Sequence, residues 1–198
     1  MNYKVTRFSQ SPNKLVNRIA PVLAFTFLAI TSMIFVPASQ AQNARGNSAL
    51  GFNSSDISGF PSGQVTLTGG GAFNLATGFV NSSGGFRCIS DVNQGPLSGC
   101  LAGQGVRWDT ANLLSSTTFK CTGATGETLK TANTSPGNTT PDTVVLLADF
   151  YRAGDGNDES FTARMIVSTR DLAPDIPGVQ NVWIQGVGCG SAIVNFNH

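Results

Sequence analysis

TVVLLADFY (Thr143–Tyr151) is an apolar run of strand length, and it is rich enough in aliphatic residues to be covered on both faces. After the polar turn at residues 152–159 comes SFTARMIVS (Ser160–Ser168), in which every second residue from Phe161 to Val167 is apolar. Two strand-length runs around a polar turn predict a long antiparallel hairpin. We expect this hairpin to form the centre of the hydrophobic core.

Outward from the hairpin, the chain reads as further short strands separated by turns. Gln64–Thr68 alternates cleanly between apolar and polar residues, and the glycines at Gly69–Gly71 are expected to end that strand. Ser82–Gly85 is expected to separate two more strands, and Asp109–Leu114 is expected to form one helical turn with Asp109 as its N-cap. A long exposed hairpin tip is expected within residues 123–141.

Composition agrees with an all-β fold, since the chain has 23 glycines and only 12% charged residues. About eight to eleven short strands with glycine-rich turns predict a single β-sandwich or jelly-roll-like domain over residues 63–198. Residues 42–62 are polar and rich in Gly, Ser and Asn, and we expect them to be a flexible lead-in that packs on the domain only in part.

The N-terminus has the order of segments found in secretory leaders. Four basic and no acidic residues occur in positions 1–18, an apolar run follows at Ile19–Val36, and Pro37–Ala41 supplies small residues for cleavage. This pattern predicts a bacterial-type signal peptide at residues 1–41 with cleavage after Ala41. The apolar run is also close to the length that spans a bilayer, so a retained anchor is the alternative. Export to the periplasm or the medium is expected.

Removal of that leader changes the sign of the net charge. The chain has 12 Lys and Arg and 11 Asp and Glu, and four of the basic residues lie in the leader, so the remainder carries 8 − 11 = −3. A mildly acidic domain with scattered basic residues does not resemble a nucleic-acid-binding protein. It also lacks a basic amphipathic stretch for a membrane surface, so both partner classes are disfavoured.

Four cysteines, Cys88, Cys100, Cys121 and Cys189, all lie beyond the leader. An even number of cysteines in an exported protein predicts two disulfides, for which three connectivities exist. A local bridge from Cys88 to Cys100 across a turn-rich loop is favoured, and it leaves Cys121 to pair with Cys189. The alternative of a metal centre needs Cys-x-x-Cys or Cys/His spacing, which the sequence lacks.

The acidic residues around the turn of the central hairpin form a candidate calcium site. Oxygen ligands are available from Asp149, Asp155, Asn157, Asp158 and Glu159, and calcium accepts six to eight oxygens in flexible geometry. The spacing does not match a twelve-residue calcium loop. A plain solvated turn is the alternative, because Asp, Asn and Gly all tolerate tight turns.

No intact catalytic motif is present. The single histidine, His198, is the last residue, which disfavours a nucleophile–histidine hydrolase. A pair of carboxylates could hydrolyse glycosides, and a cleft that holds two of them beside Trp108 or Trp183 would favour this alternative.

Several stretches resemble uncharacterised exported proteins of environmental bacteria. They are Gly70–Phe73, Phe86–Cys88, Leu147–Arg152 with Gly154–Asp158, and Val182–Gly190. The resemblance implies export and a β fold, and it transfers no activity. We therefore expect an exported, non-catalytic protein with a binding or structural role, whose partner is a carbohydrate or another extracellular protein. The alternative is a carbohydrate-active enzyme.

Overall fold

The computed structural model describes residues 46–59, 62–125, 128–131, 135–152 and 160–198. Within these ranges every regular element is a β-strand. The strands are β1 (Ser48–Ser58), β2 (Gln64–Asn74), β3 (Phe79–Ser90), β4 (Arg107–Leu114), β5 (Ser116–Phe119), β6 (Thr122–Thr125), β7 (Thr128–Thr131), β8 (Ser135–Asn138), β9 (Thr143–Tyr151), β10 (Ser160–Ser168), β11 (Val182–Ile184) and β12 (Gly188–Asn197). Among the described residues, no helix is long and apolar enough to cross a membrane.

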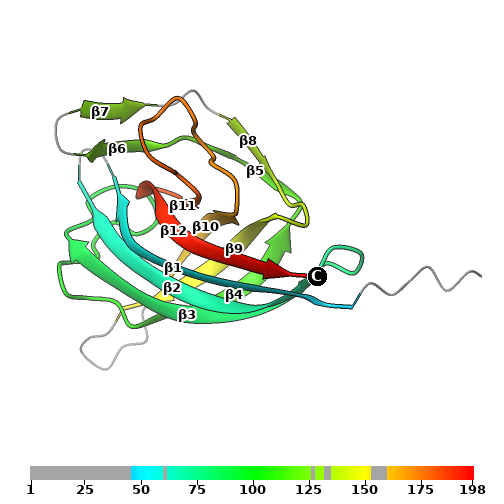
Figure 1. Cartoon of the computed structure of the whole chain (residues 1–198). Coiled ribbons are helices and arrows are strands. Elements are labelled where there is room, and N and C mark those ends of the chain that lie inside the picture. The colour runs from blue at the N-terminus through cyan, green and yellow to red at the C-terminus, as the bar shows by residue number, and fades with distance from the viewer. Residues whose placement is uncertain (1–45, 60–61, 126–127, 132–134, 153–159) are drawn as a thin grey trace, which may run out of the picture. The chain divides into compact units, whose positions relative to one another are not determined.

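Eight of the strands close into an antiparallel barrel, so the predicted sandwich is wrong although the all-β class is right. The order around the barrel is β1-β12-β11-β10-β9-β4-β3-β2, and β1 hydrogen-bonds to both β2 and β12 (Figure 1). A sandwich keeps two separate sheets with free edges, whereas here the first and last strands pair and remove those edges. Alternating apolar residues are common to both architectures, so the pattern does not distinguish them.

The predicted lead-in at residues 42–62 contains a full barrel strand. In β1 the side chains of Leu50, Phe52 and Ile57 are buried in the barrel interior. A bulge shifts the register of β1 between Asn53 and Asp56 against β12 and between Ser54 and Ile57 against β2, and it returns Ile57 to the interior face. The polar residues that suggested flexibility lie mainly on the outer face, so the barrel begins at Ser48 rather than at Gly63.

Two glycine-rich segments that were expected to end strands instead lie inside long ones. β2 is 11 residues long and includes Gly69–Gly71. β3 is 12 residues long and includes Gly84 and Gly85. A Cβ on Gly69 would collide with the Trp108 ring and would lie 2.8 Å from the Ser83 carbonyl oxygen. Glycine is therefore needed here because another part of the protein approaches the backbone closely.

The central hairpin is confirmed. β9 and β10 pair without interruption from Thr143↔Ser168 to Tyr151↔Ser160, and the first half of β9 is buried on both faces. The segment expected to be a helical turn is β4, which pairs with β9 from Arg107 to Leu114 with one register shift after Thr110. The small sheet of β6 and β7 corresponds to the expected hairpin within residues 123–141.

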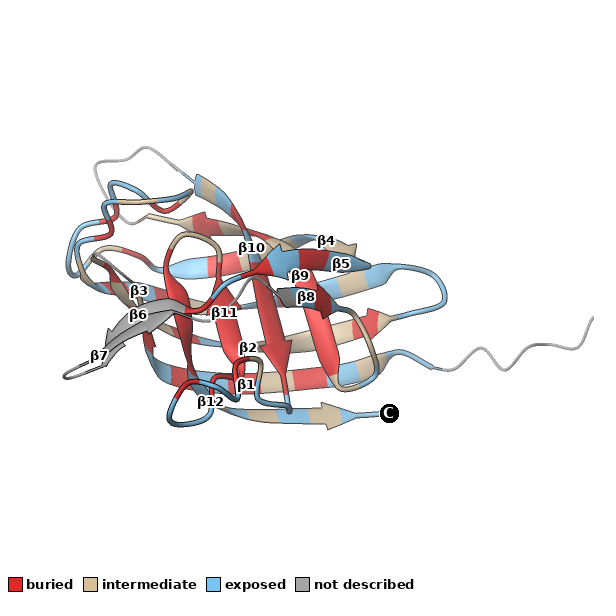
Figure 2. Cartoon of the chain, turned by 90° about the horizontal axis from the view of Figure 1, so that it is seen from above, coloured by how far each residue is buried: buried red, intermediate tan, exposed pale blue. Residues whose placement is uncertain are grey.

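The barrel has two hydrophobic cores, one inside it and one on part of its outer surface. Figure 2 colours each residue by burial, and β11 is buried along its whole length. Large side chains fill the interior, led by Trp108, Phe73, Phe150, Leu146 and Met165, each fully buried. The second core lies on the outer faces of β9, β10 and β11, under the β5–β8 pair and the loop at residues 169–181. Its buried members are Phe119, Cys121, Val145, Ile166, Ala173, Ile176, Trp183 and Cys189.

One disulfide lies in each core, and the pairing is the one that the sequence favoured. Cys88–Cys100 is fully buried in the inner core, where it holds the loop at residues 91–105 against β3. Cys121–Cys189 lies in the outer core and ties the segment after β5 to β12. Disulfides of this kind are typical of proteins in oxidising compartments.

Candidate functional site

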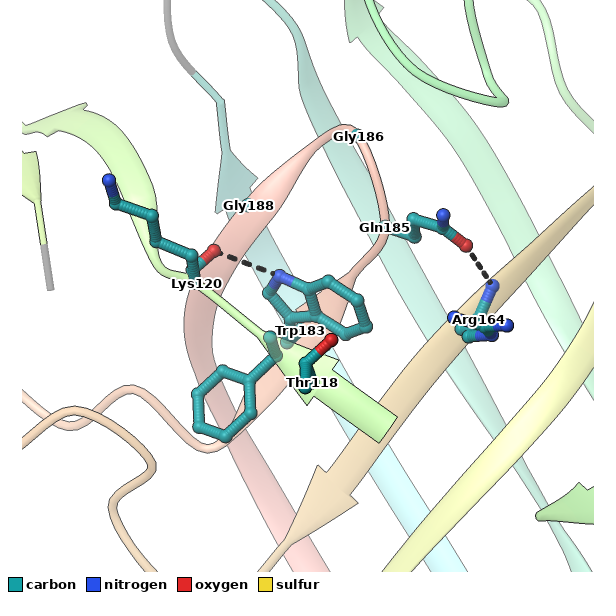
Figure 3. Close-up of a pocket in the computed structure, with 8 residues that line it drawn as sticks. Thr118, Lys120, Arg164, Trp183, Gln185, Gly186 and Gly188 are labelled. Atoms are coloured by element: carbon teal, nitrogen blue, oxygen red, sulfur yellow. Dashed lines mark hydrogen bonds between the residues drawn. The ribbon is translucent and has the colours of Figure 1, made fainter. Parts of the chain in front are cut away.

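The first candidate site is a groove on the outer surface, between β5 and the turn that joins β11 to β12 (Figure 3). Its volume is about 340 Å³. The residues that line it come from three separate parts of the chain. They are Thr118, Phe119, Lys120, Arg164, Trp183, Gln185, Gly186 and Gly188. We call this site the β5 groove.

Trp183 holds the floor of the β5 groove in place. Its side chain is 6% exposed, and its indole Nε1–H donates a hydrogen bond of 3.1 Å to the carbonyl oxygen of Lys120. The Phe119 ring packs against it with 6.0 Å between ring centroids. Because a buried indole N–H needs an acceptor, this bond fixes the distance between the end of β5 and the barrel wall.

Arg164 and Gln185 form the opposite wall. Arg164 faces outward because it alternates along β10 with the inward residues Ala163 and Met165. Its backbone N–H donates to Gln185 Oε1 at 3.2 Å, and the Gln185 N–H donates to its carbonyl oxygen at 2.9 Å. The tight turn continues through Gly186, whose φ of +82° favours glycine.

Both charged side chains that line the described part of the β5 groove are cations. Lys120 and Arg164 are both exposed, and Figure 3 shows them on opposite sides of the Trp183 indole. Neither makes an ion pair with a carboxylate in the part of the chain that the structure describes, and no acidic residue lines the groove. Two cations with no anion partner favour an anionic ligand.

Two other grooves are chemically less distinctive. One, of about 420 Å³, lies between β1 and residues 177–180, and it contains Asp56, whose carboxylate already accepts hydrogen bonds from Ser58 and Gln64. The other, of about 380 Å³, runs along β2 and β3 beside Arg87. Neither combines two unpaired cations with an anchored aromatic floor, so the β5 groove is the best-defined candidate of the three.

The calcium site expected from the sequence stays a prediction. Asp155, Asn157, Asp158 and Glu159 lie outside the described residues, and Asp149 is on the outer face of β9. The Asp149 carboxylate accepts a 2.6 Å hydrogen bond from the Thr162 hydroxyl. Among the described residues, no three carboxylate, histidine or cysteine side chains gather as metal ligands would.

Two carboxylates do lie on neighbouring strands, because Asp109 on β4 is directly opposite Asp149 on β9. Asp109 is 3.5 Å from Arg107 Nε. Trp108 faces the barrel interior and is fully buried, so it offers no surface to a sugar. Trp183 lines the β5 groove, which contains neither carboxylate. The arrangement required for the glycosidase alternative is therefore not formed by these residues.

A cluster that sequence reasoning missed lies at the C-terminus. His198 Nδ1 is 3.1 Å from the Ser48 hydroxyl, and its Nε2 is 3.8 Å from an Asp142 carboxylate oxygen. These are the residue types of a hydrolase triad. The Asp142 carboxylate, however, also binds Arg170 at 3.2 Å, and none of the three grooves contains these residues. The cluster connects the C-terminus to β1 and to the turn before β9.

Comparison with known proteins adds no assignment to this geometry. No protein-family model, curated protein or solved structure matches the chain. The properties that bear on function are thus those of the described residues: a filled barrel, two buried disulfides and a cationic groove on the outer core.

Proposed function

We propose that this protein is exported and acts outside the cytoplasm as a non-catalytic binding protein, which holds an anionic ligand in the β5 groove. The observation that carries the proposal is the pair of exposed cations, Lys120 and Arg164, around the anchored indole of Trp183. Side chains fill the barrel interior, which leaves the outer surface for recognition.

Export is supported by two independent features. The leader pattern at residues 1–41 predicts secretion, and both disulfides suit an oxidising compartment. Expression of the full chain in a bacterial host tests this part, since the periplasmic fraction should contain a protein with oxidised cysteines that begins at Gln42. Recovery of the intact chain in the membrane fraction would instead support a retained anchor.

The binding role is tested with extracellular polymers of different charge. Acidic polysaccharides and acidic peptides should bind the oxidised protein, whereas neutral polysaccharides should not. Substitution of Arg164→Gln should weaken the interaction by about tenfold, because a charge-assisted contact is lost. Arg87→Gln removes an exposed arginine from β3 and is the matched control. Equal losses from both variants would show that only the overall charge matters, and would contradict the β5 groove as the site.

A further inference from the structure

One edge of β5 is open toward the β5 groove. β5 pairs with β8 and with no other strand among the described residues. The Thr139 N–H donates to the Ser115 carbonyl oxygen at 2.9 Å, which makes Ser115 and Thr139 a hydrogen-bonded pair. Hydrogen-bonded pairs alternate in an antiparallel ladder, so Thr117 and Phe119 also face β8. The backbone groups of Ser116, Thr118 and Lys120 therefore face the other way.

That other side is the β5 groove. The Lys120 carbonyl oxygen already accepts the indole N–H of Trp183, a residue of the groove floor, which confirms the direction of this edge. At Thr118 no bond to the backbone N–H is found in the described structure. The Thr118 carbonyl oxygen accepts only the Thr117 hydroxyl at 3.2 Å, which leaves it a second lone pair. An exposed backbone edge of this kind can pair with an added strand.

The two cations of the β5 groove determine which kind of strand can be added to β5. Lys120 and Arg164 lie on opposite sides of Trp183, and neither is neutralised by a described carboxylate. A second copy of this chain that paired through the same edge would bring its own Lys120 and Arg164 to these two, so like charges would repel. A segment with acidic side chains would be attracted instead.

We propose that the β5 groove binds an extended acidic peptide segment of a partner protein, which adds as a strand to the open edge of β5. This inference rests on the proposed anion-binding function and names its ligand class. The peptide backbone pairs with the N–H and carbonyl of Thr118, and its carboxylates lie near Lys120 and Arg164. The β5 groove, with a volume of about 340 Å³, lies directly beside this edge, since Thr118, Phe119 and Lys120 line it.

The test uses the oxidised protein and four synthetic peptides with blocked ends. The first alternates Glu with Val over seven residues, and the second has Gln in place of Glu. The third and fourth are the Glu peptide N-methylated at one or the other set of alternate residues, so that each lacks the N–H groups along one edge. The affinity of the protein for each peptide is measured by titration. The change in tryptophan fluorescence is a second readout.

A pair of variants at Thr118 separates strand addition from charge. Thr118→Pro removes the N–H that faces the groove, and it breaks no bond to β8 because Thr118 stands opposite Pro136 at a position that is not hydrogen-bonded. Thr118→Val keeps the N–H and is the control. We expect Thr118→Pro to bind the Glu peptide about tenfold or more weakly than Thr118→Val does. Unfolding curves of both variants verify that the fold is kept.

The outcomes distinguish this inference from the function on which it rests. Binding of the Glu peptide with loss in one N-methylated peptide and in Thr118→Pro supports strand addition. Binding that needs Arg164 but is unaffected by Thr118→Pro and by both N-methylations would overturn strand addition and retain the anion-binding groove. Preference for an acidic polysaccharide over every peptide would overturn the peptide as ligand. Failure of all anionic probes would overturn both proposals.

Discussion

The indole N–H of Trp108 donates a 2.9 Å hydrogen bond to the carbonyl oxygen of Thr68, two strands away in the barrel. Trp108 is on β4, and the residue opposite it on the intervening β3 is Gly84. The Trp108 ring lies against Gly69 on β2, where a Cβ would collide with it. The largest side chain of the inner core is thus accommodated by a glycine two strands away.

Substitution of Gly69→Ala is therefore expected to lower the free energy of unfolding by about 3 kcal/mol, because overpacking a rigid core forces the ring or the strand to move. Gly51→Ala on β1 is the matched control, since a Cβ there meets no atom within 4 Å. This control should be neutral or slightly stabilising, by about 0.5 kcal/mol. Urea unfolding at equilibrium measures both, and equal effects would show that Gly69 is not required for the Trp108 contact.

The same contact explains why the sequence predicted the end of β2 wrongly. Three consecutive glycines normally indicate a turn, and the partner that gives Gly69 its role is 39 residues away in the chain, at Trp108. The hairpin of β9 and β10 was predictable because its hydrophobic pattern and its turn are local. Closure of the barrel depends on the pairing of Phe52 with Val194, which no local pattern reveals.

A second glycine contact holds the loop at residues 91–105 against the turn between β11 and β12. A Cβ on Gly95 would collide with the backbone of Gly186, and Gly95 also has a φ of +66°. Gly103, in the same loop, has a φ of +85° but open space around it. Alanine at either position strains the backbone, and alanine at Gly95 also pushes the loop away from the turn.

We therefore expect Gly95→Ala to destabilise the protein by about 2 kcal/mol more than Gly103→Ala does. The difference between the two variants isolates the contact, since both carry the cost of positive φ. Thermal and urea unfolding would measure it. Equal destabilisation would mean that the loop can separate from the turn without loss of packing.

The two disulfides should differ in their contribution to stability. Cys121 and Cys189 are 68 residues apart, and Cys88 and Cys100 are 12 apart. The loop-entropy model gives about 4 kcal/mol for the longer loop and about 3 kcal/mol for the shorter. All four side chains are buried, so paired alanine substitutions remove similar amounts of packing.

Cys121→Ala with Cys189→Ala is thus expected to lower the free energy of unfolding by about 1 kcal/mol more than Cys88→Ala with Cys100→Ala. Guanidinium titration of the two double variants measures the difference. A larger loss from the Cys88–Cys100 pair would indicate that its place in the inner core outweighs loop length. Since burial excludes reductant, the folded protein should also keep both bridges in dithiothreitol until denaturant is added.

The candidate site was less predictable than the fold for a physical reason. Lys120 directly follows β5 and Arg164 is an outward-facing residue of β10, and only the packing of β5 over Trp183 brings them to one groove. The outward position of Arg164 follows from the alternation of apolar residues in 160–168. That pattern does not predict which residues lie across the groove from Arg164. The predicted acidic turn, in contrast, consists of residues that are close together in the sequence, so its composition alone suggests a calcium site.

The facing carboxylates of Asp109 and Asp149 give the last prediction. Like charges directly opposite on paired strands repel, so Asp149→Asn should raise the free energy of unfolding by about 0.5 kcal/mol in EDTA. The gain is reduced by the weaker acceptor that asparagine offers to Thr162. Thr162→Val is the control, because it removes that hydrogen bond and keeps both charges.

The same variants test the calcium hypothesis for Asp149 when thermal unfolding is repeated with calcium. If calcium binds between the strands, it should raise the melting temperature of the natural protein and leave Asp149→Asn unchanged, because one ligand oxygen and one charge are lost. Equal responses in the two proteins would exclude Asp149 as a ligand. No response in either, with the stabilisation by Asp149→Asn in EDTA retained, would leave the pair as simple cross-strand repulsion on the outer face of the barrel.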